Sequence, residues 1–280
     1  MRKLFSSKGK RNSKKVKIKK YIPYLIIIPV CMFLIIFGLS SLLKMELEDA
    51  AAKDEYDGLR EIFLSTPQPQ ETPEPQETPK PDIPAGDSDG DDGDEEDDEE
   101  DEAEEVEPLT MDELARINPD FVGWISIKNH LEYPVVRGND NDRYINITFS
   151  GQQNSAGAIF MDYRNSKDFN DNVTIIYGHR TRRGMMFSPV TSYLDNSFLR
   201  ANPIITITAR DGKTLTYRIF SAKQTDAWDA AFSIGFTDPQ NAASVFPNAP
   251  ANASKFLLLS TCTASDDQDE RIIVFAALEE

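Results

Sequence analysis

The fold is decided by two apolar stretches near the C-terminus, Lys255-Phe-Leu-Leu-Leu-Ser-Thr-Cys-Thr263 and Arg271-Ile-Ile-Val-Phe-Ala-Ala-Leu278. The first stretch carries a cysteine near its end, the second begins with an arginine, and a short polar segment separates them. Apolar runs of this length, divided by a polar loop, are typical of two buried strands. We therefore expect the Cys262 thiol and the Arg271 guanidinium at one end of a sheet, where a nucleophile and a stabiliser of negative charge work together.

Six more short strands are expected between this pair and the N-terminal part of the chain. Turn residues separate them, and Asp211-Gly212 is a typical hairpin turn. Eight short strands with few long helices predict a mainly β protein, folded as a closed or nearly closed eight-stranded β-barrel. The expected strands are 121–127, 131–136, 158–162, 173–177, 204–208, 215–222, 255–262 and 271–278.

Three short helices are expected around these strands. Thr110-Met-Asp-Glu113 is a capping box, which starts a helix. Apolar residues recur at helical spacing in 185–199 and predict a second helix there. Asp238-Pro239 combines an N-cap residue with proline at the first helical position and predicts the start of a third.

The N-terminal part of the chain has the composition of a membrane anchor. Residues 21–43 contain no charged side chain and, as a helix, would extend roughly 35 Å, enough to cross a bilayer. The preceding basic segment, 1–20, carries ten Lys or Arg residues, which predicts a cytoplasmic N-terminus and an extracellular remainder. A cleaved signal peptide is the alternative, but the run is long for one and no convincing small-residue cleavage site follows it. We expect an uncleaved, single-pass anchor in the cell membrane.

Composition changes twice between the anchor and the folded domain, which we expect at 108–280. Residues 44–64 are typical of a polar juxtamembrane helix, and 65–107 of an extended, disordered linker that is first Pro-rich and then acidic. The net charge of −17 belongs mostly to this linker, because 86–107 alone carry sixteen acidic residues. The domain has sixteen basic and twenty acidic residues, a balance that gives no support for nucleic-acid binding.

Cys262 is the only thiol of the expected domain, since Cys31 lies in the apolar span. A buried structural role is the common use of a free cysteine. His179 favours a reactive one, because it follows the apolar run Val173-Thr-Ile-Ile-Tyr177 and a glycine, at the end of an expected buried strand. Cysteine, histidine and arginine together provide a nucleophile, a general acid and base, and a partner for a tetrahedral oxyanion.

A metal site is the rival use of a cysteine and a histidine. It would need three or four ligands. The expected domain has no second cysteine, and its other histidine, His130, lies in a polar turn and is expected to be a surface residue without a role. We therefore expect neither a metal nor another cofactor.

These motifs in combination resemble the sortases, the membrane-anchored cysteine transpeptidases of Gram-positive bacteria. Leu259-Ser-Thr-Cys262 looks like the sortase nucleophile strand, Arg271 holds the position of the family's arginine, and Ile176-Tyr-Gly-His179 looks like the histidine loop. Further stretches are similar to class B sortases in particular. They are Asn118-Pro-Asp-Phe-Val-Gly-Trp-Ile125, Tyr133-Pro-Val-Val136 and Ala158-Ile-Phe-Met-Asp-Tyr-Arg-Asn165.

The resemblance implies a sortase-type barrel and a two-step transfer of secreted proteins. Cys262 would attack the threonine carbonyl of a C-terminal sorting signal, and an amine of peptidoglycan or its lipid-linked precursor would take the acyl group from the thioacyl enzyme. His179 would act as general acid and base, and Arg271 would hold the oxyanion and the substrate carbonyl. By the same resemblance, Tyr177, Ser260 and Asn146 would line the substrate groove.

The sequence departs from the family pattern at three places: Leu258 where many sortases have threonine, a short Ala-, Asn- and Pro-rich segment between Phe236 and Ser254, and the linker 65–107. Three other functions stay open. One is a pilin-polymerising sortase that uses a protein lysine as acceptor. The others are a non-catalytic surface binding or scaffold module, and a plain cysteine peptidase.

Overall fold

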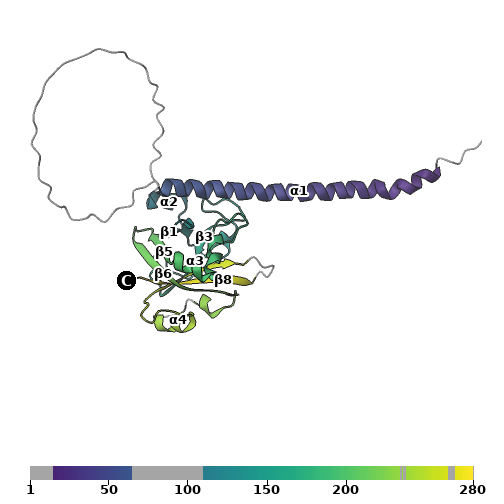
Figure 1. The fold of residues 1–280 in the computed structure, drawn as a ribbon. Helices are drawn as coiled ribbons and strands as arrows, with labels where there is room; N and C mark the ends of the chain where they lie inside the picture. Colours follow the sequence, from purple (N-terminus) through teal and green to yellow (C-terminus); the bar gives the residue numbers. More distant parts are fainter. Residues whose placement is uncertain (1–14, 65–109, 234, 236–237, 264–268, 280) are drawn as a thin grey trace, which may run out of the picture.

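The structure, a computed structural model, describes residues 15–64 and 110–279 except for 234, 236, 237 and 264–268. Eight strands close into a barrel in the order β1-β2-β3-β4-β7-β8-β6-β5 (Figure 1). The expected mainly β, eight-stranded barrel is thereby confirmed. The strands are β1 (Phe121–Ile127), β2 (Leu131–Val136), β3 (Ile159–Met161), β4 (Val173–Tyr177), β5 (Ile204–Ala209), β6 (Thr214–Asp226), β7 (Phe256–Cys262) and β8 (Glu270–Leu278).

Two of the strand pairs are parallel, β2 with β3 and β4 with β7, and the others are antiparallel. The largest difference from the expected boundaries is in β6, which continues to Asp226 and pairs with β8 as far as Glu270. This extension matters for function, because it carries the chain to the end of the barrel where β7 ends and β8 begins.

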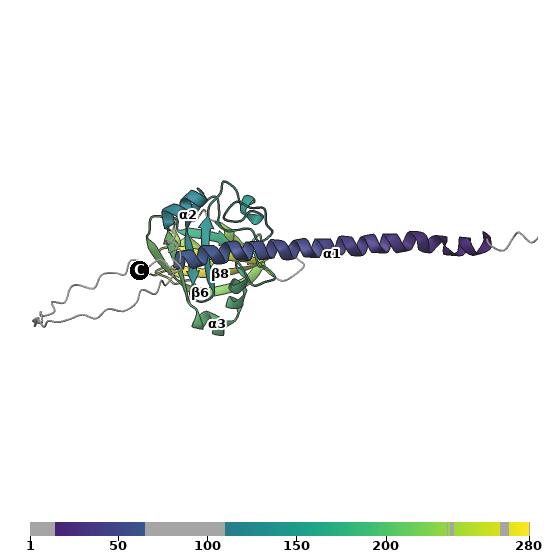
Figure 2. The same cartoon turned by 90° about the horizontal axis from the view of Figure 1, so that it is seen from above.

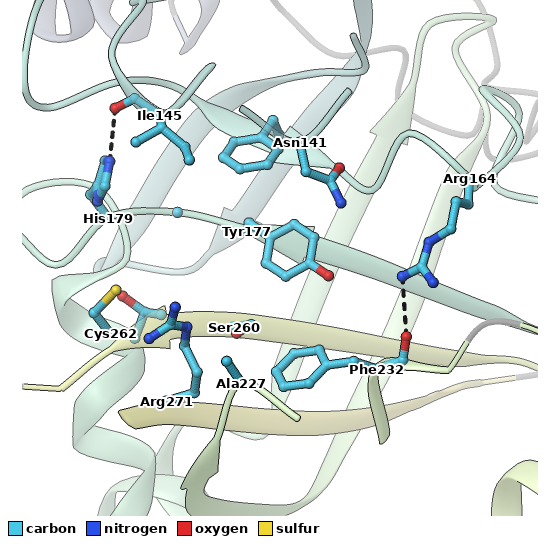
Figure 3. Close-up of a pocket in the computed structure, with 13 residues that line it drawn as sticks. Asn141, Ile145, Arg164, Tyr177, His179, Ala227, Phe232, Ser260, Cys262 and Arg271 are labelled. Atoms are coloured by element: carbon cyan, nitrogen blue, oxygen red, sulfur yellow. Dashed lines mark hydrogen bonds between the residues drawn. The ribbon is translucent and has the colours of Figure 1, made fainter. Parts of the chain in front are cut away.

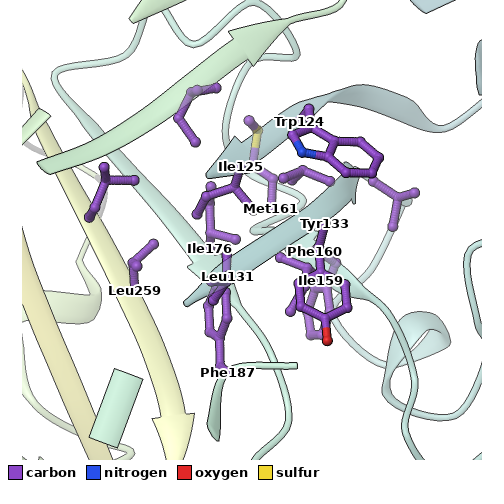
Figure 4. Packing of buried hydrophobic residues seen from close by; sticks show 14 of the residues in the cluster. Trp124, Ile125, Leu131, Tyr133, Ile159, Phe160, Met161, Ile176, Phe187 and Leu259 are labelled. Atoms are coloured by element: carbon purple, nitrogen blue, oxygen red, sulfur yellow. The ribbon is translucent and has the colours of Figure 1, made fainter. Parts of the chain in front are cut away.

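The unbroken apolar pattern of β7 follows from burial on both of its faces. Leu257 and Leu259 belong to the main hydrophobic cluster, part of which is drawn in Figure 4. Phe256 and Leu258 belong to a second cluster, in which Phe246, the residue after α4 (Pro239–Val245), packs edge-on against Phe256 at 5.1 Å. Because side chains alternate along a strand, Ser260 and Cys262 continue the face of β7 that enters this second cluster.

The helices around the barrel are short. Thr110 caps α2 with the expected capping box, and Asp238 caps α4. The expectation of one helix over 185–199 was wrong: a 3-10 helix is followed by a separate α-helix. The buried Val190 and Tyr193 are three residues apart, one full turn of a 3-10 helix. The helices are α2 (Met111–Ile117), η1 (Arg143–Ile145), η2 (Ser188–Leu194), α3 (Asn196–Ala201), η3 (Ala230–Phe232) and α4 (Pro239–Val245).

One long helix, α1 (Lys15–Leu64), covers both the expected span 21–43 and the expected juxtamembrane helix 44–64 without a break. Its described side chains from Ile27 to Leu43 are exposed, and by length and composition this helix is able to cross a membrane. Its C-terminal part lies along the barrel (Figures 1 and 2).

The docking of α1 was not expected from the sequence. Ala52, Tyr56 and Phe63 are buried, and the Phe63 ring stacks on Trp124 of β1 at 4.1 Å. The expected linker 65–107 lies outside the described residues.

Candidate active site

The C-terminal strand pair places Cys262 and Arg271 opposite each other, as the last register pair of the β7–β8 ladder. Cys262 is a partly exposed free thiol, and the Arg271 guanidinium donates a hydrogen bond to the carbonyl of Glu270 at 3.1 Å. Figure 3 shows both side chains at the same edge of one pocket. The thiol and the guanidinium therefore lie at the same end of the sheet, as expected from the sequence.

The parallel register of β4 and β7 brings His179 to the same edge. Tyr177, the last residue of β4, pairs with Ser260, so that His179, two residues beyond the end of β4, reaches the level of Cys262. Gly178, between them, donates its N–H to the Ser260 carbonyl at 3.2 Å. A Cβ at position 178 would lie 2.7 Å from the Phe187 ring, which is why only glycine fits before the histidine.

The His179 ring is held by a backbone carbonyl. Its Nε2 lies 2.8 Å from the Ile145 oxygen, at the end of η1 (Figure 3). A carbonyl oxygen only accepts hydrogen bonds, so Nε2 carries the proton in this bond and Nδ1 is the nitrogen left for proton transfer. The backbone of His179 is held as well, since its carbonyl accepts the Phe187 N–H at 2.9 Å.

The pocket has a volume of about 420 Å³ and contains five of the six site residues proposed from the sequence: Cys262, His179, Arg271, Tyr177 and Ser260. The sixth, Asn146, is exposed beside Ile145 and is not among the lining residues. The rest of the lining comes from the loops after β2, β3, β4 and β6 and from η1, β3, β7 and η3. These residues are Asn141, Ile145, Phe160, Arg164, Gly178, Ala227, Phe232 and Thr261.

A buried carboxylate organises the end of the pocket away from Cys262. Asp162 is fully buried and accepts hydrogen bonds from Arg164 at 2.7 and 2.8 Å, from the Tyr177 hydroxyl at 3.0 Å and from the Asn141 amide at 3.1 Å. Burial acts to raise the pKa of Asp162, but the hydrogen bonds from Arg164 and Tyr177 outweigh it and lower that pKa below its ordinary value. Burial, reinforced by the Asp162 charge, raises the pKa of Tyr177.

Asp162, Arg164 and Asn141 were not singled out from the sequence. The signal that identified His179 also applies to Asp162, which directly follows the buried strand β3. Arg164 reaches further and donates to the Phe232 carbonyl of η3 at 3.1 Å (Figure 3).

Comparison with known proteins gives consistent matches. A sequence model described as the sortase domain matches residues 126–279. Sortase B of Staphylococcus aureus is 33% identical over 181 residues, which cover 60% of this chain and 73% of that protein. Sortase B of Listeria monocytogenes is 42% identical over 92 residues, which cover 32% of this chain and only 37% of the relative. The X-ray structure of Clostridium perfringens sortase B superimposes with a TM-score of 0.55 at 28% identity, covering 61% of this chain and 100% of that one.

Proposed function

Because the chain belongs to the sortase family of cysteine transpeptidases, we propose that it acts as a class B sortase on secreted proteins. It cleaves a C-terminal sorting signal after threonine and transfers the protein to an amine of peptidoglycan or its precursor. The observation that carries the proposal is the convergence of Cys262, His179 and Arg271 on one edge of a single pocket.

In the first half-reaction the Cys262 sulfur attacks the threonine carbonyl carbon. A carbon–sulfur bond forms, the thiol proton passes to His179 Nδ1, and Arg271 stabilises the negative charge on the carbonyl oxygen. The carbon–nitrogen bond then breaks, and the leaving amine takes the proton from His179. In the second half-reaction an acceptor amine attacks the thioester carbon and loses a proton to His179 as the new carbon–nitrogen bond forms. The carbon–sulfur bond then breaks, and His179 returns the proton to the Cys262 sulfur.

Ser260 and Tyr177 are proposed to bind the substrate in different ways. The Ser260 hydroxyl is buried and, within the described part of the chain, has no hydrogen-bond partner, so it suits a polar atom of the sorting signal. The Tyr177 hydroxyl is already bonded to Asp162, which leaves the ring as its contribution to the pocket. Asn146 lies outside the lining and is proposed only as a residue beside the pocket.

We propose that α1 anchors the enzyme in the cell membrane with its N-terminus in the cytoplasm and the barrel outside. Ten basic residues before the apolar run support this orientation. The loop after His179 contacts α1 just beyond that run, because Arg182 donates to the Met45 sulfur at 3.7 Å and Arg183 pairs with Glu46. This contact supports a pocket that works close to the membrane surface.

The test is a transfer assay with the full chain in detergent, a library of threonine-containing sorting peptides and a small amine. We expect a peptide–amine product identified by mass, which Cys262→Ala abolishes together with cleavage. His130→Ala is the matched control, because His130 is exposed, bonds Asn202 at 3.0 Å and does not line the pocket.

The other functions give different results in the same assay. A peptidase releases the same hydrolysis product whether or not amine is added, and a binding module gives no Cys262-dependent product. A pilin polymerase prefers a lysine-containing protein over a cell-wall amine when both are offered. Full transfer by Cys262→Ala would refute the proposal.

A further inference from the structure

Two loops that lie beside His179 are in contact with α1. The first joins β2 to β3 and includes 146–157, where Asn154 donates its side-chain amide to the Glu48 carbonyl at 2.7 Å and the Ser150 N–H bonds Glu55 at 2.8 Å. The second follows His179 and includes Arg183, which pairs with Glu46 and lies 3.5 Å from Asp49. The general base is therefore framed by segments that both rest on the docked helix.

Tyr56 makes the most deeply buried of these contacts. Its side chain is 2% exposed, and its ring packs edge-on against Tyr133 at 5.2 Å. The Tyr56 hydroxyl donates to the Gly157 carbonyl at 2.7 Å and accepts the Phe149 N–H at 3.1 Å. One side chain from the helix thus fixes two backbone groups of the loop that precedes β3.

A short chain of contacts leads from Gly157 to His179. Gly157 has a positive φ of +59°, and a Cβ there would lie 2.5 Å from the carbonyl oxygens of both Tyr144 and Ile145. The next residue, Ala158, donates its N–H to the Tyr144 carbonyl at 3.0 Å. The Gly157 backbone, which Tyr56 holds, therefore lies next to the Ile145 carbonyl with no room for a side chain between them. That carbonyl binds His179 Nε2 at 2.8 Å.

We propose that Tyr56 is a positioning residue for His179, so that the anchor helix is part of the catalytic unit. This inference rests on the proposed function. Tyr56 fixes the position of the 144–158 segment relative to the barrel. The Ile145 carbonyl in this segment then orients the imidazole of His179 so that Nδ1 is turned to the reacting atoms. Misplacing a catalytic group by about 1 Å costs on the order of a hundredfold in rate, so a partial shift has a large kinetic effect.

The test is Tyr56→Phe in the full chain, which keeps the ring and removes both hydrogen bonds. We expect kcat to fall by about tenfold, part of the loss for a full 1 Å shift, with KM for the peptide unchanged. Rates are normalised to titrated Cys262 thiol. Tyr193→Phe is the matched control, because Tyr193 is equally buried, donates to the Asn202 carbonyl at 2.8 Å and does not line the pocket.

A double-mutant comparison separates positioning from general destabilisation. If Tyr56 acts through His179, Tyr56→Phe causes no further loss in a His179→Ala background. An equal loss in both backgrounds, an equal loss in Tyr193→Phe, or a wild-type kcat in Tyr56→Phe would overturn the inference.

A measurement that does not depend on catalysis distinguishes a failure of this inference from a failure of the proposed function. The chain has two histidines, so ¹⁵N-histidine labelling gives one reference, His130, and one probe, His179. We expect the Nε2 proton of His179 to exchange faster with water in Tyr56→Phe, and His130 to stay unchanged. Unchanged exchange at His179 contradicts the inference, whereas an inactive wild-type chain contradicts only the proposed function.

Discussion

The two ends of the pocket differ in how completely their buried polar groups are hydrogen-bonded. At the far end, the buried Asp162 carboxylate is satisfied by Arg164, Tyr177 and Asn141. At the reactive end, Ser260 Oγ is buried without a hydrogen-bond partner among the residues that the structure describes. An unsatisfied buried group costs about 1–3 kcal/mol, and we propose that a bound sorting signal removes this cost. One end is therefore a fixed frame, and the other is kept for the ligand.

The largest effect is expected at the reactive end, from Arg271→Ala. Loss of an oxyanion donor lowers kcat by about a hundredfold to a thousandfold, with little change in thermal stability. Arg271→Lys keeps the charge without the planar fork and recovers only part of the rate. Steady-state kinetics on a sorting peptide measure the change. Arg218→Ala is the control, since Arg218 is exposed and pairs with Glu279. Equal losses of kcat in the two variants would contradict a specific role for Arg271.

A substitution at the Asp162 end of the pocket is expected to change the stability of the fold. Asp162→Asn removes the charge that Arg164 and Tyr177 bind and lowers the free energy of unfolding by about 2 kcal/mol, below the usual cost for a fully buried pair because Arg164 is half-exposed. Urea unfolding measures it. The surface change Glu279→Gln is expected to cost under about 1 kcal/mol, and equal losses would contradict a special role for Asp162.

The pH dependence follows from the lowered pKa of Asp162. The folded state favours the carboxylate, so its stabilising contribution is complete above the unfolded-state pKa of about 4 and is lost as pH falls through the lower folded pKa. The stability difference between wild type and Asp162→Asn should therefore shrink below about pH 4. A difference that grows on acidification would have the wrong sign.

The two smallest predicted effects, from removing one hydroxyl at each end of the pocket, distinguish the ends most clearly. Ser260→Ala removes a hydroxyl that we propose is hydrogen-bonded only by substrate. We therefore expect KM to rise by about fivefold, the equivalent of one net hydrogen bond, while stability holds or improves. Tyr177→Phe removes a hydroxyl that the frame uses, so stability falls by about 1 kcal/mol while KM holds. Steady-state kinetics and thermal melts of the two variants measure both quantities. A KM that rises only in Tyr177→Phe, or a stability that falls only in Ser260→Ala, would contradict the proposed difference between the two ends.

The barrel strands and the reactive end could be predicted from local patterns. Apolar runs and turn residues marked the strands, and the position of His179 just after a buried run marked it as a candidate for the pocket, which it lines. The meeting of Cys262 with Arg271 needed only the assumption that neighbouring strands pair. These features depend on residues close together in the sequence.

The remaining features depend on distant partners. Tyr56 bonds Phe149 and Gly157, which lie 93 and 101 positions away, and no local pattern connects them. Arg164 joins Asp162 to η3 across 68 positions. The exposed position of Asn146 follows from the path of the loop after η1, which strand periodicity does not describe.

The proposed role of Cys262, to carry the sorted protein from one amine to another, can be tested by the intact mass of the enzyme. After brief incubation with a sorting peptide and an acid quench, we predict a thioester-linked acyl fragment ending in threonine on Cys262, which disappears when amine is added before the quench. No adduct on Cys262, or an adduct that added amine does not remove, would contradict the account.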